Sequence, residues 1–121
     1  MSLKASRMIL ALTLALSTTV LLPGVSEGAR VRFRATAGGA WDPDFRHVER
    51  GTKVIWKNPT DRRHTVTAYG RGWDKHKRLD PGERTKKTFR RNGVYKFRCK
   101  LDSTLEDGVC SGMCGEVHVG G

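Results

Sequence analysis

The sequence of 121 residues has no stretch with the three-and-four apolar spacing of an amphipathic helix, and it has no internal repeat or low-complexity segment. These absences argue against helical bundles and repeat architectures. The sequence also lacks a paired-carboxylate or Ser-His-Asp pattern on which catalysis could be built. We therefore expect one small domain that is not an enzyme.

Acidic residues are scarce: 12 Asp and Glu face 23 Lys and Arg, which gives a formal net charge of +11. Such a charge attracts anionic partners. The basic residues are spread along every segment, which, together with the export signal described next, argues against nucleic acid. We expect a monomer that meets an acidic protein face or an anionic cell surface. A basic surface that only maintains solubility is the alternative.

The first 28 residues have the layout of a secretory signal peptide. A positive start is followed by an apolar run over residues 8–22 and by small residues at Ser26 and Gly28. The run is short for a membrane span, for which ~20 residues are usual, and a retained anchor is the alternative. Cleavage would leave residues 29–121 as a secreted, periplasmic or cell-surface domain with no stable membrane span.

Alternation of apolar and polar residues runs through most of the remaining chain, and this period of two predicts strands. Turn residues separate the alternating segments, and the turn at 91–93 is the strongest of them. Six or seven short strands of this kind predict an all-β, antiparallel sandwich or barrel. The expected strands cover residues 30–36, 52–57, 64–69, 83–90, 94–98 and 116–119, and long loops are expected over 37–44 and 70–84.

Three possible metal ligands lie at strand ends with inward parity. His64 opens a strand, Cys99 closes one, and Met113 shares the inward parity of the last strand. Thiolate, imidazole and thioether together form the donor set of electron-transfer copper sites, because soft sulfur suits Cu(I) and nitrogen tolerates Cu(II). The sequence therefore predicts a copper site built on these three residues.

The other donors are weaker candidates. His118 and Cys114 have the outward parity of the last strand. His76 lies in a charged loop, and the parity of His47 is ambiguous. We expect His118 and His76 to be surface residues that bind no metal, and His47 stays unassigned.

Four segments together resemble a cupredoxin of the plastocyanin and pseudoazurin group. The resemblance implies a Greek-key β-sandwich with a blue copper site for one-electron transfer. It implies as ligands His64, Cys99, Met113 and the residue at position 102, and it implies that Asn58 braces the cysteine loop by hydrogen bonding. The segments are Gly51-Thr-Lys-Val-Ile-Trp-Lys-Asn58, His64-Thr-Val66, Gly93-Val-Tyr-Lys-Phe-Arg-Cys99 and Met113-Cys-Gly-Glu-Val-His-Val119.

The sequence departs from the family pattern at position 102, where Asp102 replaces the second histidine ligand. A carboxylate is a harder ligand than imidazole and favours Cu(II) over Cu(I). Three arrangements follow: Asp102 completes an altered site, the other three residues form an open site by themselves, or the domain has lost its metal.

The segment 103–112 is longer than the usual ligand loop of the family, and it introduces Cys110. A third cysteine makes the count odd for an exported protein. Pairing of Cys110 with Cys114 would leave Cys99 free for metal. The alternative is that one of the two supplies a substitute thiolate ligand.

Three functions follow from these expectations. The first is one-electron transfer outside the cytoplasm, with the positive surface steering the protein to an acidic redox partner. The second is copper binding or carriage without redox turnover. The third is a metal-free interaction module.

Overall fold

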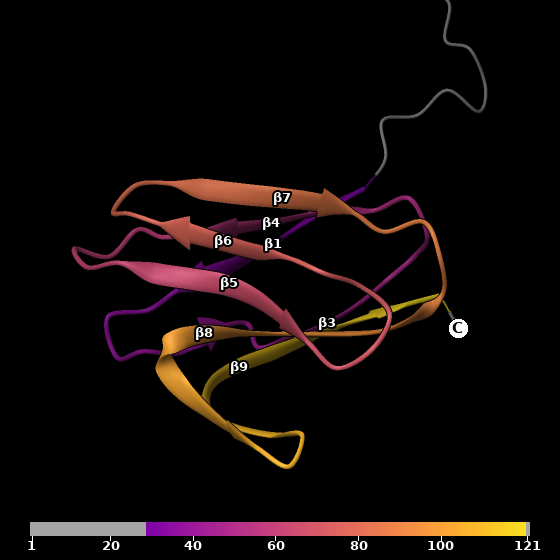
Figure 1. Cartoon of the computed structure of the whole chain (residues 1–121). Coiled ribbons are helices and arrows are strands. Elements are labelled where there is room, and N and C mark those ends of the chain that lie inside the picture. Colours follow the sequence, from indigo (N-terminus) through magenta and orange to yellow (C-terminus); the bar gives the residue numbers. More distant parts are fainter. Residues whose placement is uncertain (1–28, 121) are drawn as a thin grey trace, which may run out of the picture.

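The computed structural model describes residues 29–120, and all of the regular structure in that range is β-strand (Figure 1). The all-β prediction is therefore confirmed. No helix long and apolar enough to cross a membrane occurs in this range, and the predicted signal peptide lies outside it. The strands are β1 Arg30–Ala35, β2 Trp41–Asp42, β3 Phe45–Val48, β4 Lys53–Lys57, β5 His64–Tyr69, β6 His76–Leu79, β7 Arg84–Thr88, β8 Gly93–Glu106 and β9 Val109–Val119.

The strands form two sheets, which pack as a sandwich. One sheet has the order β2-β1-β4-β7 and the other β3-β9-β8-β5-β6. The predicted sandwich is confirmed, but its strands are not all antiparallel, because β1 runs parallel to β4 and β3 runs parallel to β9. The chain leaves β1, crosses to the other sheet for β3 and then returns, so β4 enters beside β1 in the same direction.

Three local expectations need correction. The strong turn signal at 91–93 does not join two paired strands: β7 and β8 lie in different sheets, so this segment connects the two layers. The loop predicted over 70–84 contains β6, the loop predicted over 37–44 contains β2, and β3 lies in a segment for which no strand is predicted. These strands escaped the sequence pattern because each buries a single side chain, so no alternation is visible.

Aromatic rings fill the space between the sheets and hold the inward faces in register. Phe33, Trp56 and Phe97 are fully buried, with ring centroids 4.8 Å apart for Phe33 and Phe97 and 5.3 Å apart for Trp56 and Phe97. Such aromatic pairs contribute about 0.5–1.5 kcal/mol each beyond the area they bury. Tyr95, Phe97 and Cys99 are all buried, so the parity predicted for this strand is confirmed.

The segment predicted as a long ligand loop is a β-hairpin. Beyond the main sheet β8 and β9 pair again from Ser103 with Gly112 to Glu106 with Val109. Asp107 and Gly108 form the turn with φ of 51° and 79°, and a two-residue hairpin turn of this type needs positive φ at both positions. The hairpin projects away from β1, β4 and β7 (Figure 1).

The core makes a prediction about Gly115, which faces Phe97 on the neighbouring strand. A Cβ at Gly115 would lie 2.4 Å from the Phe97 ring and 3.1 Å from the carbonyl oxygen of Asp44. Since the ring is wedged between both sheets, Gly115→Ala should lower the free energy of unfolding by about 1–3 kcal/mol. Urea denaturation measures the change. Gly38→Ala, whose added Cβ has its nearest neighbour at 4.0 Å, the Thr36 hydroxyl oxygen, is the control and should change stability by no more than about 0.5 kcal/mol.

Candidate metal centre

The site forms where the pairing of β8 and β9 is interrupted. The ladder runs to Arg98 opposite Cys114 and resumes at Ser103 opposite Gly112. Between these pairs β8 has four residues, 99–102, whereas β9 has only Met113. The extra residues make β8 bulge at one end of the sandwich, next to the beginning of β5.

Three donor atoms converge at this bulge. His64 Nδ1 lies 3.6 Å from Cys99 Sγ and 3.1 Å from Asp102 Oδ2, and Cys99 Sγ lies 3.5 Å from Asp102 Oδ2. Donors bound to one metal ion at ~2.0–2.3 Å with trigonal to tetrahedral angles lie roughly 3.3–3.9 Å apart. The three atoms are therefore placed to share a metal ion after small adjustments. No other group of three His, Cys, Asp or Glu donors converges within residues 29–120.

Burial isolates the two softer donors from solvent. His64 and Cys99 are fully buried, whereas the Asp102 side chain is 17% exposed. Burial lowers the pKa of His64, Asp102 opposes that shift, and the positive charge of Arg62 adds to it. The imidazole is therefore neutral at pH 7, which is the form that binds metal.

A hydrogen-bond chain sets the tautomer of His64. Its Nε2 lies 3.1 Å from the Thr60 hydroxyl, which donates its own proton to Asn58 Oδ1 at 2.7 Å. Because that proton is used, the hydroxyl oxygen accepts from His64 Nε2–H. The lone pair of a neutral imidazole then resides on Nδ1, the nitrogen that faces Cys99 and Asp102.

Asn58 is buried and organises the turn before His64. Its side-chain amide donates to the carbonyl oxygens of Leu79 and Arg62 at 3.0 and 2.8 Å, and its Oδ1 also accepts from the Thr60 backbone amide. These partners all lie outside the cysteine segment. The predicted hydrogen bond from Asn58 to the cysteine loop is therefore wrong, and Asn58 acts on the histidine through Thr60.

Thr65, rather than Asn58, makes the hydrogen bonds that brace the cysteine segment. Its backbone amide donates to Cys99 Sγ at 3.3 Å, and its hydroxyl accepts from the Lys100 amide at 2.9 Å. Because His64 has inward parity, alternation predicts that Thr65 points outward, yet Thr65 is buried because the β8 bulge covers it. Only its position next to His64 could have drawn attention to it in the sequence.

Asp102 divides its two oxygens between the site and an arginine. Oδ2 faces His64 and Cys99, whereas Oδ1 accepts a hydrogen bond from the Arg62 guanidinium at 2.9 Å. Burial raises the pKa of Asp102, but hydrogen bonds from Arg62 and Cys99 and the charge of Arg62 outweigh it, and the net shift is downward. The carboxylate is therefore ionised. Gly39 lies against this ion pair, where a Cβ would come within 3.2 Å of the guanidinium.

The arrangement differs from a Cys-His-Asp catalytic relay. In such a relay the nucleophile and the carboxylate contact opposite nitrogens of the imidazole. Here Cys99 and Asp102 both face Nδ1 of His64, and Nε2 bonds to Thr60. The cluster is arranged as a set of ligands around one point.

Met113 occupies the gap opposite the bulge and is fully buried. Its neighbour Gly112 has φ of 100°, and a Cβ there would lie 2.5 Å from the carbonyl oxygen of Asp102. Cys110 and Cys114 form a disulfide with their Cα atoms 6.2 Å apart, whereas an extended strand would separate them by roughly 13 Å. The bond therefore closes a sharp bend in β9 around Met113.

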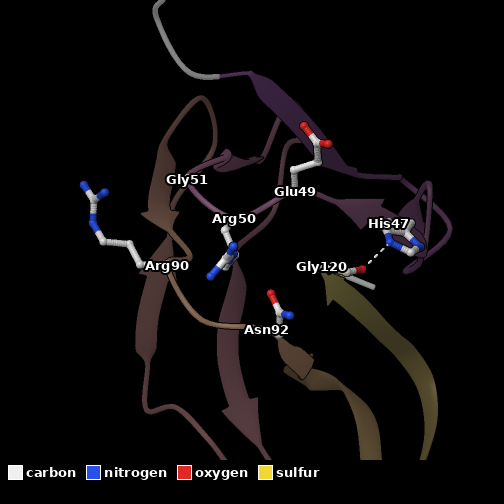
Figure 2. A pocket seen from close by; sticks show the side chains of 7 residues that line it. All are labelled: His47, Glu49, Arg50, Gly51, Arg90, Asn92 and Gly120. Atoms are coloured by element: carbon white, nitrogen blue, oxygen red, sulfur yellow. Dashed lines mark hydrogen bonds between the residues drawn. The ribbon is translucent and has the colours of Figure 1, made fainter. Parts of the chain in front are cut away.

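The remaining histidines lie outside the cluster. His118 pairs with Glu116 at 2.8 Å, and His76 contacts the Thr67 hydroxyl at 2.9 Å on β6, rather than lying in a loop. His47 bonds to the carbonyl oxygen of Gly120 beside a hollow, where Figure 2 shows the Arg90 side chain directed away.

The cysteine pairing can be tested by thiol counting in the denatured, unreduced protein. Cys99 is the one free cysteine, and the disulfide removes the other two. We expect one thiol per chain before reduction and three after it. Three before reduction would contradict the Cys110–Cys114 bond, and a Cys99→Ser variant, with an expected count of zero, identifies the reactive residue.

No protein-family model matches the chain, and no curated protein does. Among solved structures, a purple cupredoxin from Nitrosopumilus maritimus is 21% identical over 76% of this chain and 99% of its own, with a TM-score of 0.55. A reduced amicyanin variant is 20% identical over 80% of this chain and 87% of its own, with a TM-score of 0.58. A Cu-containing nitrite reductase from Thermus scotoductus is 20% identical and matches 89% of this chain but 25% of its own, with a TM-score of 0.62. The chain has the cupredoxin fold.

Proposed function

We propose that the protein binds copper through His64, Cys99 and Asp102, with Met113 as a weak thioether ligand, and transfers single electrons. The convergence of His64 Nδ1, Cys99 Sγ and Asp102 Oδ2 carries this proposal. Thiolate, imidazole and thioether are the donors that serve both copper oxidation states. The names of the similar structures support the choice of metal, since one is a Cu-containing reductase and another is a Cu(I) form of amicyanin.

Bound copper would supply the Cu(II)/Cu(I) couple, and the chain would supply ligands that hardly move. Thr60 holds the His64 ring, Thr65 holds the Cys99 sulfur and Arg62 holds the outer oxygen of Asp102. Such partners of the ligands set their orientation and tune the site. Rigid placement suits electron transfer, because both oxidation states then share one geometry.

Asp102 gives the site its particular character. Its Oδ2 is turned toward the other donors and its Oδ1 is engaged by Arg62, so it is arranged to bind through a single oxygen. A carboxylate favours Cu(II) and lowers the reduction potential, whereas the nearby guanidinium charge opposes that effect. We infer an altered type 1-like site whose potential lies below that of the same site with histidine at position 102.

Location outside the cytoplasm is part of the proposal. The Cys110–Cys114 disulfide supports it, because such bonds persist in oxidising compartments. The signal-like N-terminal segment points the same way.

Copper binding without redox turnover is the second candidate, and the aspartate in place of histidine favours it. Voltammetry of the copper-loaded protein separates the two. A reversible one-electron wave supports electron transfer, whereas copper that is retained but cannot be cycled supports a binding or carrier role.

Loading the purified protein with Cu(II) should produce a strong thiolate-to-copper charge-transfer band in the visible spectrum. Cys99→Ser should abolish the band, because Cys99 is the one free thiol. His64→Gln should weaken or shift it, whereas His118→Gln should leave it unchanged, since His118 pairs with Glu116 on the last strand. Visible and EPR spectra provide the measurement. Absence of the band with no copper retained after dialysis would refute the proposed function.

Substitution of Asp102 by histidine should strengthen the charge-transfer band and raise the reduction potential. Imidazole is softer than carboxylate and stabilises Cu(I) better, and Arg62 then loses its ion-pair partner. Spectra and voltammetry of the copper-loaded variant measure both effects. Asp74→His, at an exposed position on a distant loop, is the matched control. An unchanged spectrum in Asp102→His would show that position 102 is not near the bound metal.

A further inference from the structure

The outer face of the four-stranded sheet carries a dense group of positive side chains. Alternate residues of β1, β4 and β7 point outward, away from the core formed by Phe33 and Trp56. Seven of these outward residues are basic, and we name six of them, all except Arg30, the cationic sheet face. They are Arg32, Arg34, Lys53, Lys57, Arg84 and Lys86.

The strand register places these charges side by side. Arg34 lies opposite Lys57, and Lys57 lies opposite Arg84, so three cations form a row across three strands. Like charges directly opposite each other destabilise a sheet. Asp42 on the short edge strand is opposite Arg34, but none of the six cations forms an ion pair within residues 29–120. The face therefore keeps a concentrated charge that folding itself does not need.

The composition of the face does not suit a folded protein partner. Interfaces between proteins have an apolar centre that is depleted in charge. The central residue here is Ile55, which is only 7% exposed. The large apolar side chains that are exposed lie on the other sheet instead: Phe45 on β3, Val94, Leu101 and Leu105 on β8, and Val109 on β9.

The shape of the face suits a planar array of anions. Neighbouring strands lie about 4.8 Å apart, and alternate residues along a strand about 6.8 Å apart, so the charges form a two-dimensional lattice. A hollow of about 360 Å³ on the face formed by β1, β4 and β7 is lined in part by Arg32, Lys53, Arg84 and Lys86. This hollow accommodates a phosphate group, which several cations can contact at once.

We propose that the cationic sheet face binds the phosphate headgroups of an anionic membrane surface. Lys and Arg near such a surface contribute additively to attraction, and no apolar insertion is needed. The hairpin of β8 and β9 projects from the other side of the molecule, so it stays in solution when this face is bound (Figure 1). The binding depends on charges in a sheet that carries no metal ligand, so it stands or falls separately from the proposed copper function.

Sedimentation of the purified protein with lipid vesicles tests the proposal. The protein should bind phosphatidylglycerol vesicles at about 50 mM salt and dissociate at about 500 mM, because salt screens the attraction between its cations and the phosphate groups. Phosphatidylcholine vesicles are the control, since binding to them would reveal apolar contact with the membrane. The triple variant Arg32→Gln, Arg34→Gln, Lys86→Gln should bind at least about tenfold more weakly. Its circular dichroism melting curve should show no loss of stability, since it relieves repulsion between like charges.

The matched control removes the same charge from other places. The triple variant Arg71→Gln, Lys77→Gln, Arg78→Gln alters exposed residues on β6 and its preceding loop and should bind within about twofold of the unaltered protein. An equal loss in both variants would reduce the effect to net charge and overturn the proposal. Failure to bind phosphatidylglycerol would do the same, as would tighter binding of polyglutamate or duplex DNA through the same face.

Discussion

The unequal lengths of β8 and β9 between their two paired regions determine most of what is particular to this protein. Four residues of β8 lie opposite Met113 alone, and the surplus forces β8 to bulge at the end of the sandwich. Cys99 and Asp102 begin and end that bulge, so both reach the imidazole of His64. Beyond the bulge the strands pair again and form the hairpin. The Cys110–Cys114 disulfide closes the bend that this irregularity requires in β9.

A carboxylate in a largely buried cluster needs compensation for the water it loses. Arg62 provides it at 2.9 Å from the outer oxygen of Asp102, and Gly39 has no side chain, which lets its turn close over the pair. The inner oxygen stays turned to His64 and Cys99. Asp102 is therefore held as an ionised carboxylate, and this placement supports its proposed role as a ligand.

The two sheets divide the chemistry of the molecule between them. The five-stranded sheet supplies His64, Cys99 and Met113 and exposes the larger apolar side chains. The four-stranded sheet supplies Phe33 and Trp56 to the core and carries the cationic sheet face on its outer side. The aromatic contacts of Phe97 with Phe33 and Trp56 hold the two sheets together, so the outer surfaces of the sheets keep a fixed orientation relative to each other.

The sequence by itself determined which side chains point inward, because alternation is a local property of a strand. Alternation predicts the inward position of His64, Cys99 and Met113 and also the sandwich. The role of position 102 and the cupredoxin class are predicted from resemblance to a family. Only the tertiary structure decided which strands are neighbours, including the parallel pairs and the separation of β7 from β8. It also decided the partners of the proposed ligands: Arg62 reaches Asp102 across 40 residues, and Thr65 lies beside the cysteine where Asn58 was expected. Such contacts depend on how distant segments meet when the sandwich closes, and no local pattern in the sequence records that.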